Sequence, residues 1–131
     1  MEASEIKILV VDDEDVVNAN LEVFLEDEGF TVFTAASGEA ALRLMDRQSL
    51  DVGIIDMRLP GMDGNTLILK AHQKQPLMKF VIHTGSTNYA LPPALLDMGL
   101  TKEQVFRKPL SDLSVLTRTI NQLVTMEKRH D

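Results

Sequence analysis

The segment IKILVVDDEDVVNANLEVFLEDEG, residues 6–29, decides the fold, because it contains a strand, a polar turn and a helix in one run. The stretch Ile6–Val11, which is apolar except for Lys7, predicts a strand that is covered on both faces. Apolar residues at helical spacing then predict a helix from about Glu14 to Glu28. Gly29 suits the left-handed position that ends a helix. The segment therefore indicates one βα unit.

The same alternation of strand and helix occurs five times along the chain. We expect the strands Ile6–Val11, Thr31–Ala35, Asp51–Asp56, Lys79–His83 and Gln104–Lys108. We expect the later helices after Ser37, after Asp63, from Pro92 or Pro93 to about Met98, and from near Ser111 or Asp112. Repeated βα units are typical of an α/β fold with a doubly wound, five-stranded parallel sheet.

Length and charge limit the possible functions. The 131 residues suffice for one domain, which we place at residues 1–125 with a polar tail at 126–131. The net charge is −7, and residues 1–28 hold ten of the 20 acidic side chains but one of the 13 basic ones. This charge argues against direct binding of nucleic acid, which needs clustered Lys and Arg.

The absence of cysteine and of long apolar runs further limits the possible functions and locations of the protein. The chain has no cysteine, which excludes disulfides, thiolate metal sites and cysteine nucleophiles. No signal peptide and no apolar run of membrane-spanning length is present. We therefore expect a cytoplasmic protein without a membrane segment.

Polar residues follow the predicted strands at the edge where open α/β sheets bind ligands. Asp12 and Asp13 follow the first strand, Asp56 ends the third, Thr84 follows the fourth and Lys108 ends the fifth. Three carboxylates brought together repel one another unless a cation intervenes. Mg²⁺ suits such carboxylates and leaves positions for phosphate oxygens, while Lys108 adds a positive charge for the same anion.

This set of residues resembles the receiver domain of two-component response regulators. The resemblance covers essentially the whole chain and rests on four segments in order. They are Asp12-Asp13 after Ile-Leu-Val-Val, the run from Ile54 through Asp56-Met57-Arg58-Leu59-Pro60-Gly61-Met62-Asp63 to Gly64, Thr84-Gly85 after Val81-Ile82-His83, and Lys108-Pro109. Each segment alone is a weak signal, but all four together at the ends of the right strands are specific.

The resemblance implies a fold and a reaction. It implies the flavodoxin-like strand order 2-1-3-4-5, which periodicity alone does not give. It implies that Asp56 accepts a phosphoryl group from a phosphohistidine of a partner protein, and that the aspartyl phosphate later hydrolyses slowly. It also implies that Thr84 and Lys108 contact the phosphoryl oxygens, and that the Lys108–Pro109 peptide bond is cis, as X–Pro bonds permit.

The resemblance also implies a set of metal ligands. Asp13 and Asp56 would bind Mg²⁺ directly, Asp12 would support it through water, and the backbone carbonyl of Arg58 would be a further ligand. This agrees with the chemistry of phosphoryl transfer, which depends mostly on positioning and on neutralising charge.

Some of these residues also have simpler structural interpretations. Asp12 and Asp13 could cap a helix, although a carboxylate at the end of a buried strand, as at Asp56, is costly without a function. We expect His83 to be a buried histidine with its hydrogen bonds satisfied, and not a ligand. We expect Gly61 and Gly64 to be turn glycines.

The fourth and fifth units depart from the family pattern. The aromatic residue that the family commonly has three positions before the lysine is replaced by Val105. Strand alternation predicts that its neighbour Phe106 faces the other way. Pro92 and Pro93 predict a short fourth helix, because proline inside a helix costs roughly 3 kcal/mol.

The resemblance also suggests partners. In receivers the first helix usually contacts a sensor histidine kinase or a histidine phosphotransfer protein. Val16, Asn20 and Val23 lie away from the inward stripe of this helix, so we expect them to form that contact. A C-terminal effector domain outside this chain is also possible.

Two other functions compete with this interpretation. The first is a small Mg²⁺-dependent phosphohydrolase of the haloacid-dehalogenase type, with Asp13 as the nucleophile in the run Asp13-Glu14-Asp15-Val16. The second is an interaction module that keeps the fold but is not phosphorylated.

Overall fold

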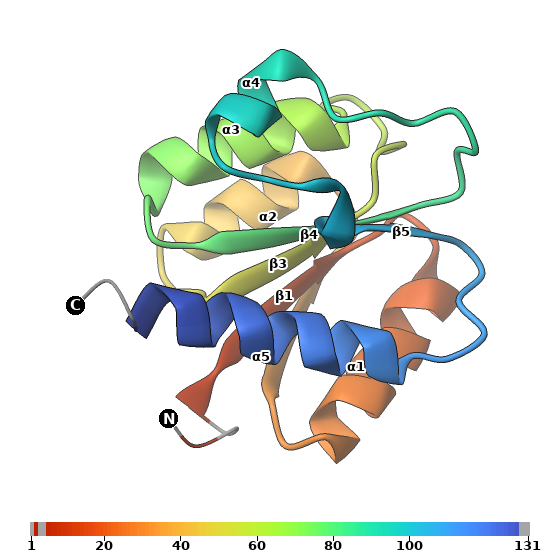
Figure 1. Cartoon of the computed structure of the whole chain (residues 1–131), viewed down its shortest axis with the longest axis vertical. Helices are drawn as coiled ribbons and strands as arrows, with labels where there is room; N and C mark the ends of the chain where they lie inside the picture. Colours follow the sequence, from red (N-terminus) through yellow and green to blue (C-terminus); the bar gives the residue numbers. More distant parts are fainter. Residues whose placement is uncertain (1, 3–4, 129–131) are drawn as a thin grey trace.

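The computed structural model describes residues 2 and 5–128, and its centre is a parallel sheet of five strands (Figure 1). The strands are β1 (Lys7–Val11), β2 (Thr31–Ala35), β3 (Val52–Ile55), β4 (Lys79–Thr84) and β5 (Val105–Arg107). Their order across the sheet is β2-β1-β3-β4-β5, and every neighbouring pair is parallel. The expected strands and strand order are confirmed.

Helices cover both faces of this sheet (Figure 1). They are α1 (Asp15–Asp27), α2 (Gly38–Met45), α3 (Gly64–Lys74), α4 (Pro93–Asp97) and α5 (Ser114–Lys128), with a short 3₁₀ helix η2 (Lys102–Gln104) before β5. α1 and α5 lie on one face, and α2, α3 and α4 lie on the other. All the helices that the sequence predicts are present.

Alternate strand residues supply two separate cores. The core beneath α1 and α5 contains Ile8, Val10, Leu21, Leu25, Ile54, Val81, Leu116 and Ile120. The core beneath α2, α3 and α4 contains Leu9, Val11, Ile55, Leu67, Ile68, Phe80, Ile82 and Leu95. Each fully buried side chain of this size contributes roughly 1.5–3 kcal/mol. The burial of both sheet faces explains why the central strands are apolar over most of their length.

Local signals set the ends of several helices. Gly29 after α1 has a φ of 100°, as expected for a glycine that ends a helix. The side chain of Ser37 accepts a hydrogen bond from the Ala40 N–H and caps α2, and Asp63 caps α3 in the same way. These caps place the loops that follow β2 and β3 at the carboxyl edge of the sheet.

The region between β4 and β5 has the features that the sequence predicts. α4 has five residues and begins at Pro93 directly after Pro92. Val105 packs against the core beneath α2, α3 and α4, whereas Phe106 packs against the opposite core. In the loop before α4, the Tyr89 hydroxyl donates to Asn65 Oδ1 at 2.7 Å.

The C-terminal helix continues beyond the expected end of the domain. α5 begins two residues after Asp112, whose carboxylate accepts the Ser114 N–H at 3.0 Å. It runs to Lys128, because the segment after residue 125 contains neither glycine nor proline. The expected tail is therefore helical over residues 126–128, and residues 129–131 lie outside the described part of the chain. The division at residue 125 stays a prediction.

Candidate metal and anion site

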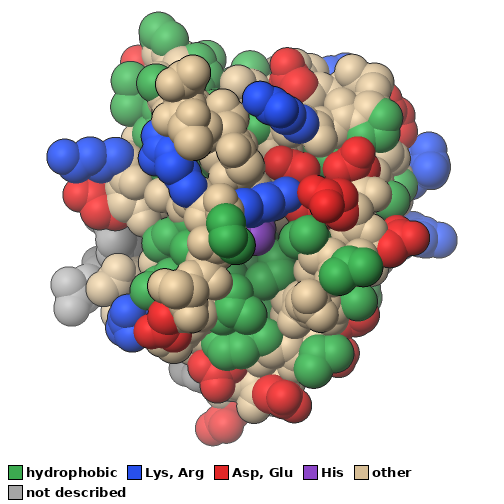
Figure 2. Space-filling model, turned by 90° about the vertical axis from the view of Figure 1, so that its right-hand side faces the viewer, with side chains coloured by type: hydrophobic (Ala, Val, Ile, Leu, Met, Phe, Trp, Pro, Cys, Tyr) green, Lys and Arg blue, Asp and Glu red, His purple; other side chains and the backbone are tan. Residues whose placement is uncertain are grey.

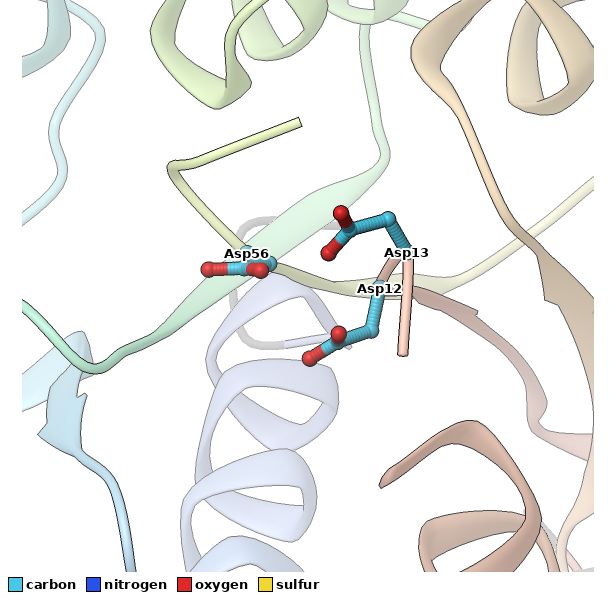
Figure 3. Close-up of side chains that lie close together, drawn as sticks. All are labelled: Asp12, Asp13 and Asp56. Carbon is cyan, nitrogen blue, oxygen red and sulfur yellow. The ribbon is translucent and has the colours of Figure 1, made fainter. Parts of the chain in front are cut away.

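Three carboxylates meet where β1 and β3 end (Figure 3). Val11 pairs with Ile55, so the next residues, Asp12 and Asp56, lie side by side. One carboxylate oxygen from each of Asp12, Asp13 and Asp56 can be chosen so that all three lie within 4.8 Å of one another. Asp12 is 1% exposed and Asp56 is 5% exposed, whereas Asp13 is open to solvent. The structure thus brings together the three aspartates that the sequence predicts.

Lys108 reaches this cluster from the end of β5. Its Nζ lies 2.6 Å from Asp12 Oδ2, 3.3 Å from Asp56 Oδ2 and 3.9 Å from Glu14 Oε1. The Lys108–Pro109 peptide bond is cis, as expected. The predicted lysine is therefore the positive charge of the cluster.

The surroundings of Asp56 disfavour its ionised form. Burial, and then the negative charge of Asp12, raise the pKa of Asp56 above its ordinary value. The positive charge of Lys108 and a hydrogen bond from the Arg58 N–H at 3.4 Å act in the opposite direction but do not outweigh burial. A further cation beside Asp56 would therefore relieve an electrostatic cost.

Lys108 remains firmly protonated in the same surroundings. Burial alone would lower the pKa of Lys108, but its hydrogen bond to Asp12 and the charge of Asp56 outweigh burial and raise it. A fixed positive charge at this point can bind the oxygens of an anion at neutral pH.

The three aspartates fit a hard divalent cation. They supply only oxygen ligands, which Mg²⁺ and Ca²⁺ prefer to nitrogen or sulfur. Mg²⁺ is usually held by one or two carboxylates and keeps several waters, which matches an exposed Asp13 beside a buried Asp56. The cluster could therefore bind a metal ion.

Thr84 and His83 lie at the end of β4. Thr84 is fully buried, and its Oγ1 accepts a hydrogen bond from the Ser86 N–H at 3.1 Å. Among the described residues, no hydrogen bond or ion pair joins the Thr84 side chain to the carboxylates. His83 is 6% exposed, so its expected burial is confirmed. Burial, and then the charge of Lys108, lower the pKa of His83 to about 4.

Asn18 of α1 holds the acidic turn in place, and the sequence reasoning did not identify it. Its Nδ2 donates to the backbone carbonyl of Asp12 at 2.8 Å and to that of Ala35 at 3.1 Å, so one side chain joins α1 to the ends of β1 and β2. The available signal was its position on the same inward stripe as Leu21 and Leu25, where a polar residue needs a partner.

Asn18 Oδ1, by contrast, is buried without a partner among the described residues. The asparagine therefore acts at this position only through its amide donor.

Comparison with known proteins points to one family. A family model for the response regulator receiver domain matches residues 8–121. The chain is 30% identical over 122 residues to the regulatory protein VanR of Enterococcus faecium, covering 93% of this chain and 52% of VanR. It is 29% identical over 116 residues to the TorCAD operon transcriptional regulatory protein TorR of Escherichia coli, covering 88% of this chain and 49% of TorR. The chain thus spans about half the length of these relatives.

Solved structures agree in fold. A response regulator receiver domain protein from Clostridium thermocellum is similar with a TM-score of 0.81 and 32% identity, and the match covers 96% of this chain and 99% of that one. The response regulator protein TrrA from Thermotoga maritima, solved in complex with Mg²⁺-BeF, is similar with a TM-score of 0.75 and 25% identity. That match covers 90% of this chain and 98% of TrrA.

Proposed function

Because the chain belongs to the family of response regulator receiver domains, the signalling domains of two-component systems, we propose that Asp56 accepts a phosphoryl group from a phosphohistidine of a partner protein. The observation that carries this proposal is the position of Asp56. It is a buried carboxylate that lies 3.3 Å from a lysine ammonium and within a cluster of metal-binding type.

In the proposed step, a carboxylate oxygen of Asp56 attacks the phosphorus atom. The P–N bond to the partner's histidine breaks, its electron pair stays on the imidazole nitrogen, and a P–O bond to Asp56 forms. Lys108 would leave Asp12 far enough to bind a phosphoryl oxygen, and the Thr84 hydroxyl would turn from Ser86 to donate to another. Slow hydrolysis of this aspartyl phosphate would end the signal, so the domain acts catalytically only on itself.

The proposed cofactor is Mg²⁺. Asp13, Asp56 and the backbone carbonyl of Arg58 would bind it directly, and Asp12 would support it through water. When bound, the cation would neutralise charge on the phosphoryl oxygens. The TrrA structure, which contains Mg²⁺-BeF, supports this choice of metal.

The test is to find the covalent phosphate. The protein is treated with a small-molecule phosphodonor and Mg²⁺, and the modified residue is located by mass spectrometry after reduction with borohydride. We expect phosphate on Asp56, none in Asp56→Asn, and wild-type labelling in Asp97→Asn, which changes an exposed aspartate on α4.

Either of two results would contradict this proposal and support a different function. Phosphate on Asp13 would support a hydrolase of the haloacid-dehalogenase type. Failure of the folded wild-type protein to bind Mg²⁺ with beryllofluoride, a phosphate mimic, would support an interaction module that is not phosphorylated.

We place the contact with the histidine kinase or phosphotransfer protein on α1. Val16 and Val23 are 70% and 60% exposed, and Asn20 between them is also exposed. The face of the molecule at the carboxyl edge of the sheet shows acidic side chains beside a basic one, with hydrophobic side chains extending away from them (Figure 2). An exposed apolar pair on the helix that follows Asp12 and Asp13 suits a transient partner.

Val16→Asp tests this contact. A charge at a position that the partner covers should slow transfer from the phosphorylated partner to Asp56 by about tenfold or more, because an unpaired charge is costly to bury. Leu77→Asp is the matched control, since Leu77 is 74% exposed in the loop after α3. Transfer to the Val16 variant at the wild-type rate would exclude α1 as the contact.

Other partners and the location of the protein follow from the same reasoning. The relatives are about twice as long as the matched region, which supports an effector domain outside the present sequence as the recipient of the signal. We propose that this receiver domain does not itself bind nucleic acid and that it acts in the cytoplasm. Within the described residues, no helix is both long and apolar enough to cross a membrane.

A further inference from the structure

His83 is a buried titratable residue to which the proposed reaction gives no role. β3 and β4 pair with Ile55 opposite Ile82, so the next residues in this register, Asp56 and His83, are neighbours. With Asp12 beside Asp56, a row of three polar residues crosses the carboxyl edge of the sheet from β1 to β4. All three are at least nine-tenths buried.

The side chains of this row point to the same face of the sheet. Val10, Ile54 and Val81, which stand two residues earlier on their strands, all belong to the core beneath α1 and α5. Because side chains alternate along a strand, the row shares that face.

Lys108 follows β5, whereas its partners Asp56 and Asp12 follow β3 and β1, so β4 with His83 lies between the lysine backbone and these carboxylates. Phe106 of β5 pairs with His83, and Lys108, which follows the last residue of β5, donates its backbone N–H to the Thr84 carbonyl at 2.8 Å. Since β4 lies between β5 and β3, the lysine side chain must cross the end of β4, which carries His83, to reach Asp56 and Asp12. The charge of Lys108 acts on the imidazole, which agrees with this proximity.

The His83 side chain has no hydrogen-bonding role in the described part of the structure. Among the described residues, none forms a hydrogen bond with the His83 side chain, so the hydrogen bonds expected for it are not found. What His83 offers at this point is therefore a filled volume beside the lysine side chain.

We propose that His83 is a positioning residue for Lys108: its ring fills the space under the lysine side chain and holds the ammonium at the carboxylate cluster. This role deepens the proposed function and rests on it, because Lys108 is the group that would bind the phosphoryl oxygens. A smaller side chain at position 83 leaves room for Lys108 to bend away from the carboxylates.

The contact itself is tested without phosphorylation. We expect NOEs between the imidazole protons of His83 and the methylene protons of Lys108 in the metal-free wild-type protein. The absence of these NOEs in a spectrum with both residues assigned would overturn the proposal, whether or not Asp56 is phosphorylated.

The consequence for binding is tested with Mg²⁺ and beryllofluoride. We expect His83→Ala to weaken beryllofluoride binding by roughly 5- to 30-fold, which corresponds to the loss of part of a charged hydrogen bond. His83→Leu, which is neutral and of similar size, should recover most of the affinity. His72→Ala is the matched control, since His72 lies on α3 away from the cluster. Thermal melts confirm that each variant is folded.

A double-mutant cycle shows whether His83 acts through the lysine. In a Lys108→Ala background, His83→Ala should change beryllofluoride affinity by less than about twofold. An equal loss in both backgrounds, or no rescue by His83→Leu in a folded protein, would contradict positioning of Lys108. If the wild-type protein binds no beryllofluoride, the proposed function fails, and the NOE experiment still decides the contact.

Discussion

Gly64 lies where α3 begins against the backbone that carries Asp56. A Cβ at this position would lie 2.3 Å from the carbonyl oxygen of Asp56 and 2.8 Å from the Cα of Met57, both backbone atoms. The sequence suggests a turn glycine, which is correct for Gly61 with its φ of 74°. Gly64 is required for a different reason, because only a residue without a side chain allows this close approach.

Gly64→Ala should therefore destabilise the protein and displace Asp56. We expect a loss of about 1–3 kcal/mol in the free energy of unfolding by urea, as for an overpacked core, together with slower phosphorylation. Gly85→Ala is the matched control, because no atom lies within 4 Å of the point that its Cβ would occupy, and its φ is not positive. Equal stability of the two variants would show that α3 can shift without cost.

His83 should make stability depend on pH. Its pKa is about 4 in the folded state against 6.5 for the ordinary side chain, so the unfolded chain binds more protons between these values. The contribution of His83 to the free energy of unfolding is therefore fully present above pH 6.5. It falls by about 3 kcal/mol as the pH is lowered towards 4.

Urea unfolding of the wild-type protein and His83→Leu at about pH 7, 5.5 and 4.5 measures this effect. The raised pKa of Asp56 acts with the opposite sign in both proteins, since its neutral form is favoured in the folded state. The difference between the two proteins therefore isolates His83. A difference that does not change with pH would mean that the imidazole titrates at its ordinary value.

The side chain of Asn18 links α1 by hydrogen bonds to the carboxyl edge of the sheet. Asn18 connects the helix to the carbonyls of Asp12 and Ala35, and thereby fixes the turn that carries Asp12 and Asp13. Because Ala35 also accepts the Asp12 N–H at 3.2 Å, the ends of β1 and β2 form one hydrogen-bonded unit with the helix.

Asn18→Ala should cost about 1–3 kcal/mol of unfolding free energy, because the buried carbonyl of Asp12 loses a donor. Amide hydrogen exchange should rise at the start of α1 more than at its end. Asn20→Ala, an exposed change on the same helix, should stay within about 0.5 kcal/mol of the wild-type protein. A small, uniform effect of Asn18→Ala would show that water replaces the amide.

Some features of the helices and strands could be predicted from the sequence, and others could not. The short α4 follows from Pro92 and Pro93, and the opposite orientations of Val105 and Phe106 follow from strand alternation. The pairing register of the strands does not follow from either signal, since it depends on how all five strands pack together. The proximity of His83 to Asp56 was for that reason not predictable, and the inward position of Asn18 showed that it needs a partner but not which carbonyls it would bind.

At the scale of the whole molecule, the three aspartates should make the stability of the protein depend on divalent cations. We expect Mg²⁺ to raise the melting temperature of the wild-type protein, because a ligand that binds only the folded state stabilises it by about 2.7 kcal/mol at a hundred times its dissociation constant. Asp13→Asn should lose most of this increase, whereas Asp97→Asn should keep it. An equal increase in both variants would place the ion elsewhere.

The sequence was sufficient for the order of the five strands and five α-helices along the chain, because each has its own local signal, but it did not predict the 3₁₀ helix η2. The arrangement of the strands across the sheet came only from the resemblance, and the structure agrees with it. Asp12, Asp13, Asp56 and Lys108 could be placed together beforehand, because the ends of parallel strands share one edge. The role of Gly64 could not be predicted, because it depends on the close approach of α3 to the backbone that follows β3.

The crowding of ten acidic residues into the first 28 also affects how quickly partners meet. Four of them, Asp12, Asp13, Glu14 and Asp15, lie together where β1 ends and α1 begins, and charges act over about 8 Å at physiological ionic strength, which is beyond the reach of direct contact. A basic partner would be drawn towards α1 before touching it, so its association rate should fall steeply as salt is added, while its dissociation rate changes little. The same four charges would repel their counterparts in a second copy of this chain, leaving the carboxyl edge of the sheet open to a partner of opposite charge.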